Sequence, residues 1–277
     1  MNAELVTTMG AQNAAEAEGI SGITVTGNKI FVLNNKNSCV SLYDCGTFNC
    51  LTIMNLKAFF SDVDLRHCAS FNGSVFVVNG STREVLLIDQ NLVLIKWSTK
   101  DDWGRLSVSP TSTIVATCYE TGALREYALQ GTLLQEIKLC KSILHPLHAI
   151  KLNDGHFVVS HGGFKDDLNR VCVVNYSGGL TKSFGDSRGS SIKQLDVPTC
   201  LAVDEDGKIL VLDRNNSRVL LLGPTLEFER ELLTKANGLR NPVAMHFDER
   251  TGRLYVADNE WEKSRWSNGK VFVFNVK

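Results

Sequence analysis

The stretch "VPTCLAVDEDGKILVLDRNNSRVLLL" occupies residues 197–222, and "NPVAMHFDERTGRLYVADN" at residues 241–259 repeats its plan. Each copy begins as an extended segment after a proline and turns at a glycine, Gly207 or Gly252. Each then continues as an apolar strand that ends in an aspartate. A plan that recurs at a fixed spacing is typical of repeat architectures, so the period of the repeat predicts the fold.

The apolar strand that follows the turn recurs six times along the chain, at spacings of 39 to 53 residues. A four-stranded propeller blade needs about 40 to 45 residues. Most of these strands are apolar on both faces, as expected for strands inside a blade that is covered by neighbouring blades. The sequence therefore predicts an all-β, six-bladed β-propeller. The six strands begin at Ile30, Val75, Ile114, His156, Ile209 and Leu254.

We expect residues 1–277 to form a single propeller domain. The sixth copy ends before its fourth strand, which would leave "VFVFNV" from Val271 as a bare edge that invites aggregation. The strand-like segment "ELVTTM", residues 4–9, is predicted to pair with it and to close the last blade. The predicted blades cover about residues 20–55, 67–99, 103–139, 147–185, 197–233 and 241–277.

Composition and charge exclude few functions, but they give no support to several of them. The chain has 29 basic and 30 acidic residues, so its net charge of -1 gives no reason to expect nucleic acid or an anionic membrane. The N-terminus lacks the basic and apolar regions of a signal peptide, and no apolar run approaches the roughly 20 residues of a membrane helix. We expect a cytoplasmic protein whose eight cysteines, without a Cys-x-x-Cys pair, are reduced and buried; disulfides or a zinc site are the alternative.

The repeat resembles the NHL family of six-bladed propellers, whose pattern ends in Asn-His-Arg and a branched residue. Here that end reads Asn216-Ser217-Arg218-Val219, with weaker echoes at residues 37–40 and 169–171, and the histidine is absent throughout. The chain is similar to the C-terminal propellers of tripartite-motif (TRIM-NHL) ubiquitin ligases, although it contains no RING, B-box or coiled-coil sequence. The resemblance implies a propeller that recognises a protein or an RNA.

Three polar residues near the starts of blades are candidates for a metal site: Glu18, His67 and His148. A glutamate with two histidines is a plausible metal set, and Glu18 resembles the calcium-binding glutamate of gluconolactonase-like propellers. Those enzymes also use Asn and Asp at blade starts, which this chain does not offer. It also has no Gly-x-Ser-x-Gly elbow and no Gly-rich phosphate loop before a helix. We therefore expect a binding module without catalytic residues or cofactor, and a metal-dependent lactonase or lyase ranks third.

The loops that join the second and third strands of the blades should share one face. They carry ten basic and nine acidic residues, which disfavours RNA, the second-ranked ligand, because phosphate contacts supply most of RNA affinity. A mixed face with Trp and Arg suits a protein or peptide partner bound by a monomer. The two-tryptophan loop at residues 258–270 is the longest of the six. The predicted binding residues are Lys36, Arg83, Arg125, Arg170, Arg214, Arg218, Trp261, Lys263, Arg265 and Trp266.

Overall fold

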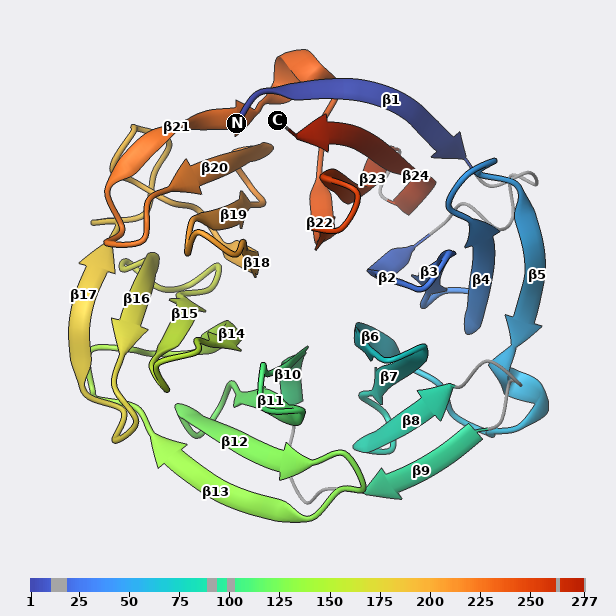
Figure 1. Ribbon diagram of the computed structural model, residues 1–277, viewed down its shortest axis with the longest axis horizontal. Coiled ribbons are helices and arrows are strands. Elements are labelled where there is room, and N and C mark those ends of the chain that lie inside the picture. The colour runs from blue at the N-terminus through green and yellow to red at the C-terminus, as the bar shows by residue number, and fades with distance from the viewer. Residues whose placement is uncertain (11–18, 89–93, 99–102, 263–264, 277) are drawn as a thin grey trace. The chain divides into compact units, whose positions relative to one another are not determined.

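The computed structural model describes residues 1–10, 19–88, 94–98, 103–262 and 265–276 (Figure 1). These residues form six four-stranded antiparallel sheets, in each of which the strands follow one another in order across the sheet. This arrangement is a six-bladed β-propeller, as the repeat period predicts. The described residues also include two 3₁₀ helices, η1 (Leu56–Ala58) and η2 (Lys235–Asn237), and none of their helices is long and apolar enough to cross a membrane.

The contacts divide the chain into two compact units of three blades each. Unit 1 comprises residues 1–100 and 237–277, and it holds blades 1, 2 and 6. Blade 1 contains β2 (Ile20–Thr26), β3 (Lys29–Asn34), β4 (Cys39–Asp44) and β5 (Cys50–Asn55). Blade 2 contains β6 (Leu65–Phe71), β7 (Ser74–Asn79), β8 (Glu84–Ile88) and β9 (Leu94–Ser98). Blade 6 contains β22 (Pro242–Asp248), β23 (Arg253–Glu262), β24 (Arg265–Val276) and β1 (Ala3–Gly10).

Unit 2 comprises residues 101–236 and holds blades 3, 4 and 5. Blade 3 contains β10 (Trp103–Val108), β11 (Thr113–Cys118), β12 (Ala123–Ala128) and β13 (Leu133–Lys138). Blade 4 contains β14 (Pro146–Lys151), β15 (Phe157–His161), β16 (Arg170–Val174) and β17 (Leu180–Phe184). Blade 5 contains β18 (Pro198–Val203), β19 (Ile209–Asp213), β20 (Arg218–Leu222) and β21 (Phe228–Leu233).

The N-terminal strand completes the last blade. β1 runs antiparallel to β24, with Ala3 opposite Val276 and Gly10 opposite Lys270 (Figure 1). The pairing supplies partners for the backbone groups of β24 that an edge strand would expose. The prediction that residues 4–9 close the sixth blade is confirmed.

The turns between first and second strands follow the predicted chemistry. Gly207 and Gly252 have φ values of +79° and +64°, the left-handed region that glycine enters without steric cost. Blade 3 lacks a glycine here, and Ser112 adopts a φ of +59° in its place. A second shared feature is a register shift near the start of every first strand, as between Pro198 and Cys200.

Within each unit, adjacent blades are joined by apolar clusters that the two-faced strands supply. In unit 1, Phe31 and Leu33 of blade 1 pack with Val75 and Val77 of blade 2. In unit 2, strands of blades 4 and 5 contribute to one cluster around Leu195, and strands of blades 3 and 4 to another. Burial of each large apolar side chain stabilises the fold by roughly 1.5–3 kcal/mol, so these clusters are the main source of cohesion inside each unit.

Candidate binding surface

The loops between second and third strands contact the linkers that lead into the next blade. In unit 2, the backbone N–H of Arg188 donates to the carbonyl of Asp167 at 2.7 Å, and Leu168 forms an isolated β-bridge with Ser187. Unit 1 repeats the arrangement, because Asn35 Oδ1 accepts a 2.8 Å hydrogen bond from the N–H of Leu65. The connections therefore share one face within each unit, and they are the natural place for a site.

The blade 5 turn, residues 214–217, is braced by the end of the NHL-like pattern. The Asp213 carboxylate accepts hydrogen bonds from the N–H of Asp196 at 2.7 Å and from Arg218 Nε at 2.8 Å. Arg218 also donates to Glu231 at 2.6 Å and to carbonyls of residues 190, 191 and 194. Burial raises the pKa of Asp213 above its usual value, although Asn216, Asp196 and Arg218 all donate to the carboxylate.

Arg218 is buried by contacts within the protein. Its side chain is only 5% exposed, and Asp213, Glu231 and three backbone carbonyls accept hydrogen bonds from the guanidinium. This burial does not support the prediction that Arg218 joins the recognition surface. A position beside a turn predicts exposure. In the structure, however, carbonyls of the linker at residues 190–194 accept hydrogen bonds from the guanidinium.

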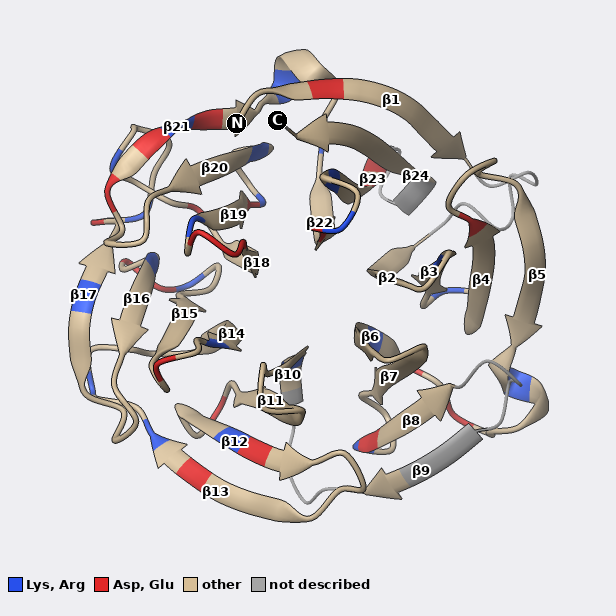
Figure 2. Cartoon of the chain, in the orientation of Figure 1, with Lys and Arg blue, Asp and Glu red and all other residues tan. Residues whose placement is uncertain are grey.

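The other predicted basic residues have different surroundings. Lys36 and Arg83 are exposed in the turns before β4 and β8. Arg125 lies within β12 rather than in a loop and forms an ion pair with Glu136 of β13 at 2.6 Å. Figure 2 shows that both strands carry charged residues. Arg170 is the first residue of β16 and is half-buried.

The two-tryptophan segment forms the end of a long hairpin rather than an open loop. β23 and β24 pair through Trp261 opposite Trp266 and Glu262 opposite Arg265. Lys263 lies outside the described residues, as do the side chains of Trp261, Arg265 and Trp266. The role of these four residues in binding stays a prediction.

The alternative metal set is not supported by its histidine in unit 2. His148 is buried; its Nδ1 accepts a hydrogen bond from the N–H of Leu201 at 3.0 Å, and its Nε2 donates to the carbonyl of Leu106 at 3.2 Å. Burial, aided by the charge of Arg105, lowers the pKa of His148 to about 3. A neutral imidazole with both nitrogens occupied has no lone pair for a metal.

The remaining members of that set lie elsewhere. His67 is buried in β6, and Glu18 falls outside the described residues. Among the residues that the structure describes, no group of three or more His, Cys, Asp or Glu side chains could hold a metal ion. His148 is therefore unsuited to the predicted Glu18, His67 and His148 metal set. Its two hydrogen bonds instead connect β14 to β10 and β18, the first strands of the neighbouring blades.

Blade 4 departs from the short turns with an eight-residue connection, residues 162–169, between β15 and β16. Gly162 has a φ of +96°, and a Cβ there would clash with the Leu168 carbonyl, so only glycine fits. Asp166 accepts a 2.6 Å hydrogen bond from the N–H of Gly163 and contacts His145 Nδ1 at 2.9 Å. The His145 ring stacks on Tyr119 of blade 3, with ring centroids 4.6 Å apart.

These contacts shift the pKa values of Asp166 and Tyr119. Burial opposes ionisation of Asp166, but the Gly163 N–H and His145 outweigh it and hold the pKa of the carboxyl below its ordinary value. Burial, with the charge of Asp166, raises the pKa of Tyr119, whose phenol therefore stays protonated at neutral pH. The connection is therefore linked through Asp166 to His145, just before β14, and the His145 ring stacks in turn on Tyr119 of blade 3.

Phe164 is the exposed centre of this connection. Its side chain is 57% exposed, and the Arg214 guanidinium of blade 5 lies 5.7 Å from its ring centroid, within cation–π range. Arg188 fixes the Phe164 backbone: it donates to the Phe164 carbonyl and pairs with Asp196 at 2.7 Å. Burial and the neighbouring Arg105 lower the pKa of Arg214, which still remains charged at neutral pH.

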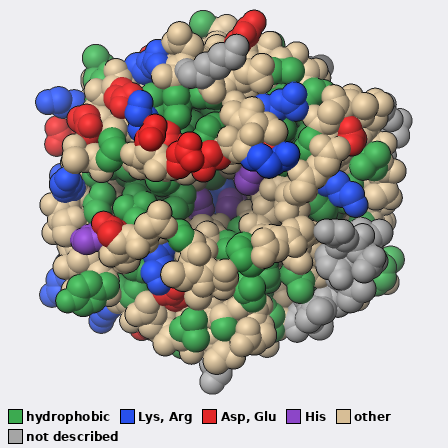
Figure 3. All heavy atoms as spheres, in the orientation of Figure 1, with side chains coloured by type: hydrophobic (Ala, Val, Ile, Leu, Met, Phe, Trp, Pro, Cys, Tyr) green, Lys and Arg blue, Asp and Glu red, His purple; other side chains and the backbone are tan. Residues whose placement is uncertain are grey.

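The surface around Phe164 is mixed in character. We call it the blade 4–5 surface and define it as residues 162–169, residues 185–197 and the turn at residues 214–217. It exposes Phe164, Leu168 and Ile192, three large apolar side chains. Its charges balance, with the four basic residues Lys165, Arg188, Lys193 and Arg214 against the four acidic residues Asp166, Asp167, Asp186 and Asp196. The face drawn in Figure 3 also shows basic, acidic and hydrophobic side chains intermixed.

Arg214 is among the predicted binding residues, whereas Phe164, which it contacts, and His145, Asp166 and Arg188, which hold the connection, are not. One signal was available. The connection "HGGFKDDLN", residues 161–169, is longer than the blade 5 turn and places an aromatic residue after two glycines and before three charged residues. The contacts of His145 and Arg188 depend on linkers that pack against the connection, which the repeat pattern does not reveal.

The six four-stranded sheets define the class of this protein as a six-bladed β-propeller, and one of its blades contains an NHL repeat. Residues 195–220, which contain the braced blade 5 turn, match the NHL repeat model. No curated protein matches the chain.

Solved structures resemble the chain over nearly its whole length. A catalytically inactive virginiamycin B lyase from Staphylococcus aureus, solved with quinupristin, superposes with a TM-score of 0.69 at 12% identity, covering 100% of both chains. A streptogramin B lyase gives 0.67 at 11% identity over 99% of each chain. A protein of unknown function from Bacteroides thetaiotaomicron gives 0.69 at 14% identity over 99% of this chain and 76% of its own. Likeness at these identities shows the shared fold alone.

Proposed function

We propose that the protein is a non-catalytic recognition module that binds a segment of another protein on the blade 4–5 surface. The observation that carries the proposal is the Phe164–Arg214 pair, an exposed aromatic ring under a guanidinium contributed by the next blade. Aromatic and Arg side chains dominate the energetic centres of protein interfaces. A role resembling that of the tripartite-motif propellers, as the partner-binding part of a ubiquitin-ligase assembly, is the finer form of the proposal.

The surroundings of the pair favour binding because they limit the entropy lost on association. Phe164 sits on a connection held by Asp166, Arg188 and Asn169, the last of which donates to the Asp166 carbonyl at 3.0 Å. Ordering an interface side chain or loop costs about 0.5–1.5 kcal/mol per immobilised side chain. A loop that is already fixed avoids part of that cost.

The charge balance favours a protein over RNA. A surface with as many acidic as basic residues releases few counterions from a polyanion, so its RNA affinity is weak and insensitive to salt. The same mixture offers donors and acceptors for peptide backbone and for side chains of either sign.

Site-specific photocrosslinking tests the proposal. A benzophenone amino acid replaces Phe164, and a matched protein carries it at Tyr176, which is 77% exposed in the turn at the opposite end of the same blade. We expect a discrete crosslinked protein from position 164 that is missing from position 176. The complex should then re-form from purified components.

Two results would count against the proposal. Equal crosslinking from both positions would mean that the blade 4–5 surface has no special affinity. Crosslinks to RNA, together with an affinity that falls steeply with salt, would assign the surface to nucleic acid instead.

A further inference from the structure

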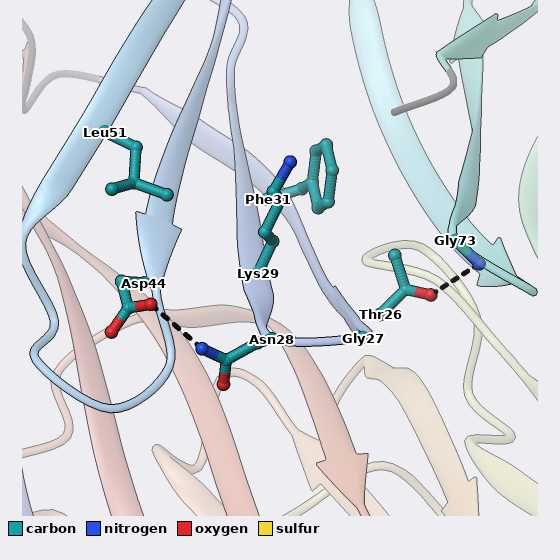
Figure 4. Close-up of a pocket in the computed structure, with 8 residues that line it drawn as sticks. All are labelled: Thr26, Gly27, Asn28, Lys29, Phe31, Asp44, Leu51 and Gly73. Carbon is teal, nitrogen blue, oxygen red and sulfur yellow. Dashed lines mark hydrogen bonds between the residues drawn. The ribbon is translucent and has the colours of Figure 1, made fainter. Parts of the chain in front are cut away.

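Unit 1 contains a pocket at the turns between first and second strands. It lies where the β2–β3 turn of blade 1 approaches Gly73 in the β6–β7 turn of blade 2 (Figure 4). Its volume is about 200 Å³. Sites for drug-sized ligands measure about 300–1,000 Å³, so this pocket suits a ligand of few heavy atoms or one terminal residue of a peptide. The blade 4–5 surface belongs to unit 2 and contributes no residue to this pocket.

The two charged residues of the pocket differ in their bonding. Lys29 and Asp44 are opposite each other in the β3–β4 pair. Asp44 Oδ1 accepts hydrogen bonds from the N–H groups of Gly46 and Thr47 at 2.9 and 2.8 Å, and Oδ2 accepts one from Asn28 Nδ2 at 2.9 Å, drawn in Figure 4. The hydrogen bond from the Thr47 N–H is the main cause that keeps the pKa of Asp44 below its usual value.

Lys29 is the charged residue of the pocket whose ammonium is available for an ion pair with a ligand. Within the described residues its ammonium forms no ion pair, and Figure 4 shows the group beside Phe31, two residues along the same strand, rather than beside Asp44. The carboxylate that could neutralise it already holds the β4–β5 turn and Asn28. A negatively charged ligand group would therefore gain an ion pair without breaking one.

The other lining groups define the rest of the ligand. The Thr26 hydroxyl accepts a 2.9 Å hydrogen bond from the N–H of Gly73, which leaves its own proton free to donate. Phe31 and the 54% exposed Leu51 form apolar walls on either side of Lys29 (Figure 4). Two donors between apolar walls fit a group that only accepts hydrogen bonds and is attached to an apolar body.

We propose that this pocket binds a carboxylate carried on a small aliphatic or aromatic body. Lys29 supplies the ion pair, Thr26 donates a hydrogen bond, and Leu51 and Phe31 cover the apolar part. A free short-chain acid and the C-terminal residue of a peptide present the same chemistry. Both sources are therefore arms of the test.

The test is a titration of ¹⁵N-labelled full-length protein followed by amide chemical shifts. The probes are 4-methylpentanoate, its uncharged amide, and a tetraglycyl-leucine peptide with either a free or an amidated C-terminus. We expect saturable shifts centred on Gly27 and Gly73 with 4-methylpentanoate or with the free-acid peptide. The one that binds more tightly identifies the source, and each amide should bind at least about tenfold more weakly, a loss of 1.4 kcal/mol.

Variants assign the interaction to residues. Lys29→Met should weaken the acid about tenfold or more, whereas Lys29→Arg keeps the charge and should retain binding. Leu51→Ser should weaken it by a smaller factor because part of the apolar wall is lost. Lys57→Met, which removes an exposed charge in η1 of the same unit, is the matched control and should bind as the wild type does.

Several results would overturn the proposal. Equal affinity for an acid and its amide would show that the pocket does not recognise the charge of the carboxylate. Binding that survives Lys29→Met in a folded variant would place the carboxylate elsewhere. Failure of both acids to produce saturable shifts at Gly27 and Gly73 would remove the site altogether.

Discussion

Blades 4 and 5 build the same four-stranded sheet but connect their second and third strands in different ways. Blade 5 uses the short turn at residues 214–217, which the buried Asp213–Arg218 pair braces. Blade 4 uses the longer connection at residues 162–169, which presents Phe164 to solvent. Residues of the repeat pattern therefore maintain the fold, whereas the connection that departs from the pattern presents an exposed surface.

The contrast between Arg214 and Arg218 makes the same distinction within four residues of sequence. Arg218 belongs to the NHL-like pattern and is enclosed by Asp213, Glu231 and backbone carbonyls. Arg214 precedes the pattern's last four residues and lies over the Phe164 ring of the neighbouring blade. Chemically identical groups therefore have separate surroundings: Arg218 stabilises the blade 5 turn, and Arg214 belongs to the surface that we propose for binding.

The largest effect is expected for Arg218→Ala. The substitution leaves the Asp213 carboxylate buried without its cation, and breaking a buried pair costs about 3–5 kcal/mol of unfolding free energy. Urea denaturation measures the loss. Arg214→Ala, the matched control, should cost less than about 1 kcal/mol because the side chain is only half-buried. Similar losses in both variants would erase the distinction between the two arginines.

Acidification should also weaken the contacts between blades 4 and 5. His148 of β14 accepts the Leu201 N–H of β18 while neutral, and its pKa of about 3 is below the value near 6.5 of an unfolded histidine. A group with a lowered folded pKa contributes stability that is complete above the unfolded value. That stability is lost as the pH falls toward the folded value.

For His148 alone the expected loss is about 1.4 kcal/mol per pH unit below 6.5, or roughly 2 kcal/mol at pH 5. His161 of the same blade, whose pKa burial lowers to about 4, adds to the slope. Denaturation between pH 7.5 and about pH 5 measures the change. The His148→Asn variant should be less stable at pH 7.5 but lose less on acidification; an unchanged slope would contradict the role assigned to His148.

A smaller effect is expected for Asp166→Ala. This change removes the acceptor of the Gly163 N–H and the partner of His145, and a single hydrogen bond contributes about 0.5–1.5 kcal/mol. Hydrogen exchange should accelerate in residues 162–169 and stay unchanged in the blade 5 turn. Equal protection in the variant and the wild type would mean that other contacts fix the connection.

Much of the fold could be predicted from the sequence because each repeat is marked by short-range features of the sequence. Gly207 and Gly252 mark turns that need positive φ, Asp213 and Asp258 end apolar strands, and the missing fourth strand of blade 6 identified β1. Such features depend on neighbours a few residues away or on a period that can be counted.

The candidate surface was predicted less well because it depends on contacts between distant segments. A turn position alone could not distinguish Arg218, which the linker at residues 190–194 covers, from Arg214, which it leaves accessible. Arg125 was assigned to a loop because its strand begins at Ala123, close to a turn glycine. His148 looked like a ligand because the two backbone groups that occupy its nitrogens come from other blades.

The most direct test of the central claim is the Phe164→Ala variant, with its melting temperature and its affinity for the crosslinked partner measured on the same preparation. We expect an unchanged melting temperature, because the ring is mostly exposed, and an affinity reduced about tenfold or more, as for an interface anchor. Tyr176→Ala should change neither quantity. A lower melting temperature with intact affinity would make the blade 4 connection a structural element and would contradict the account.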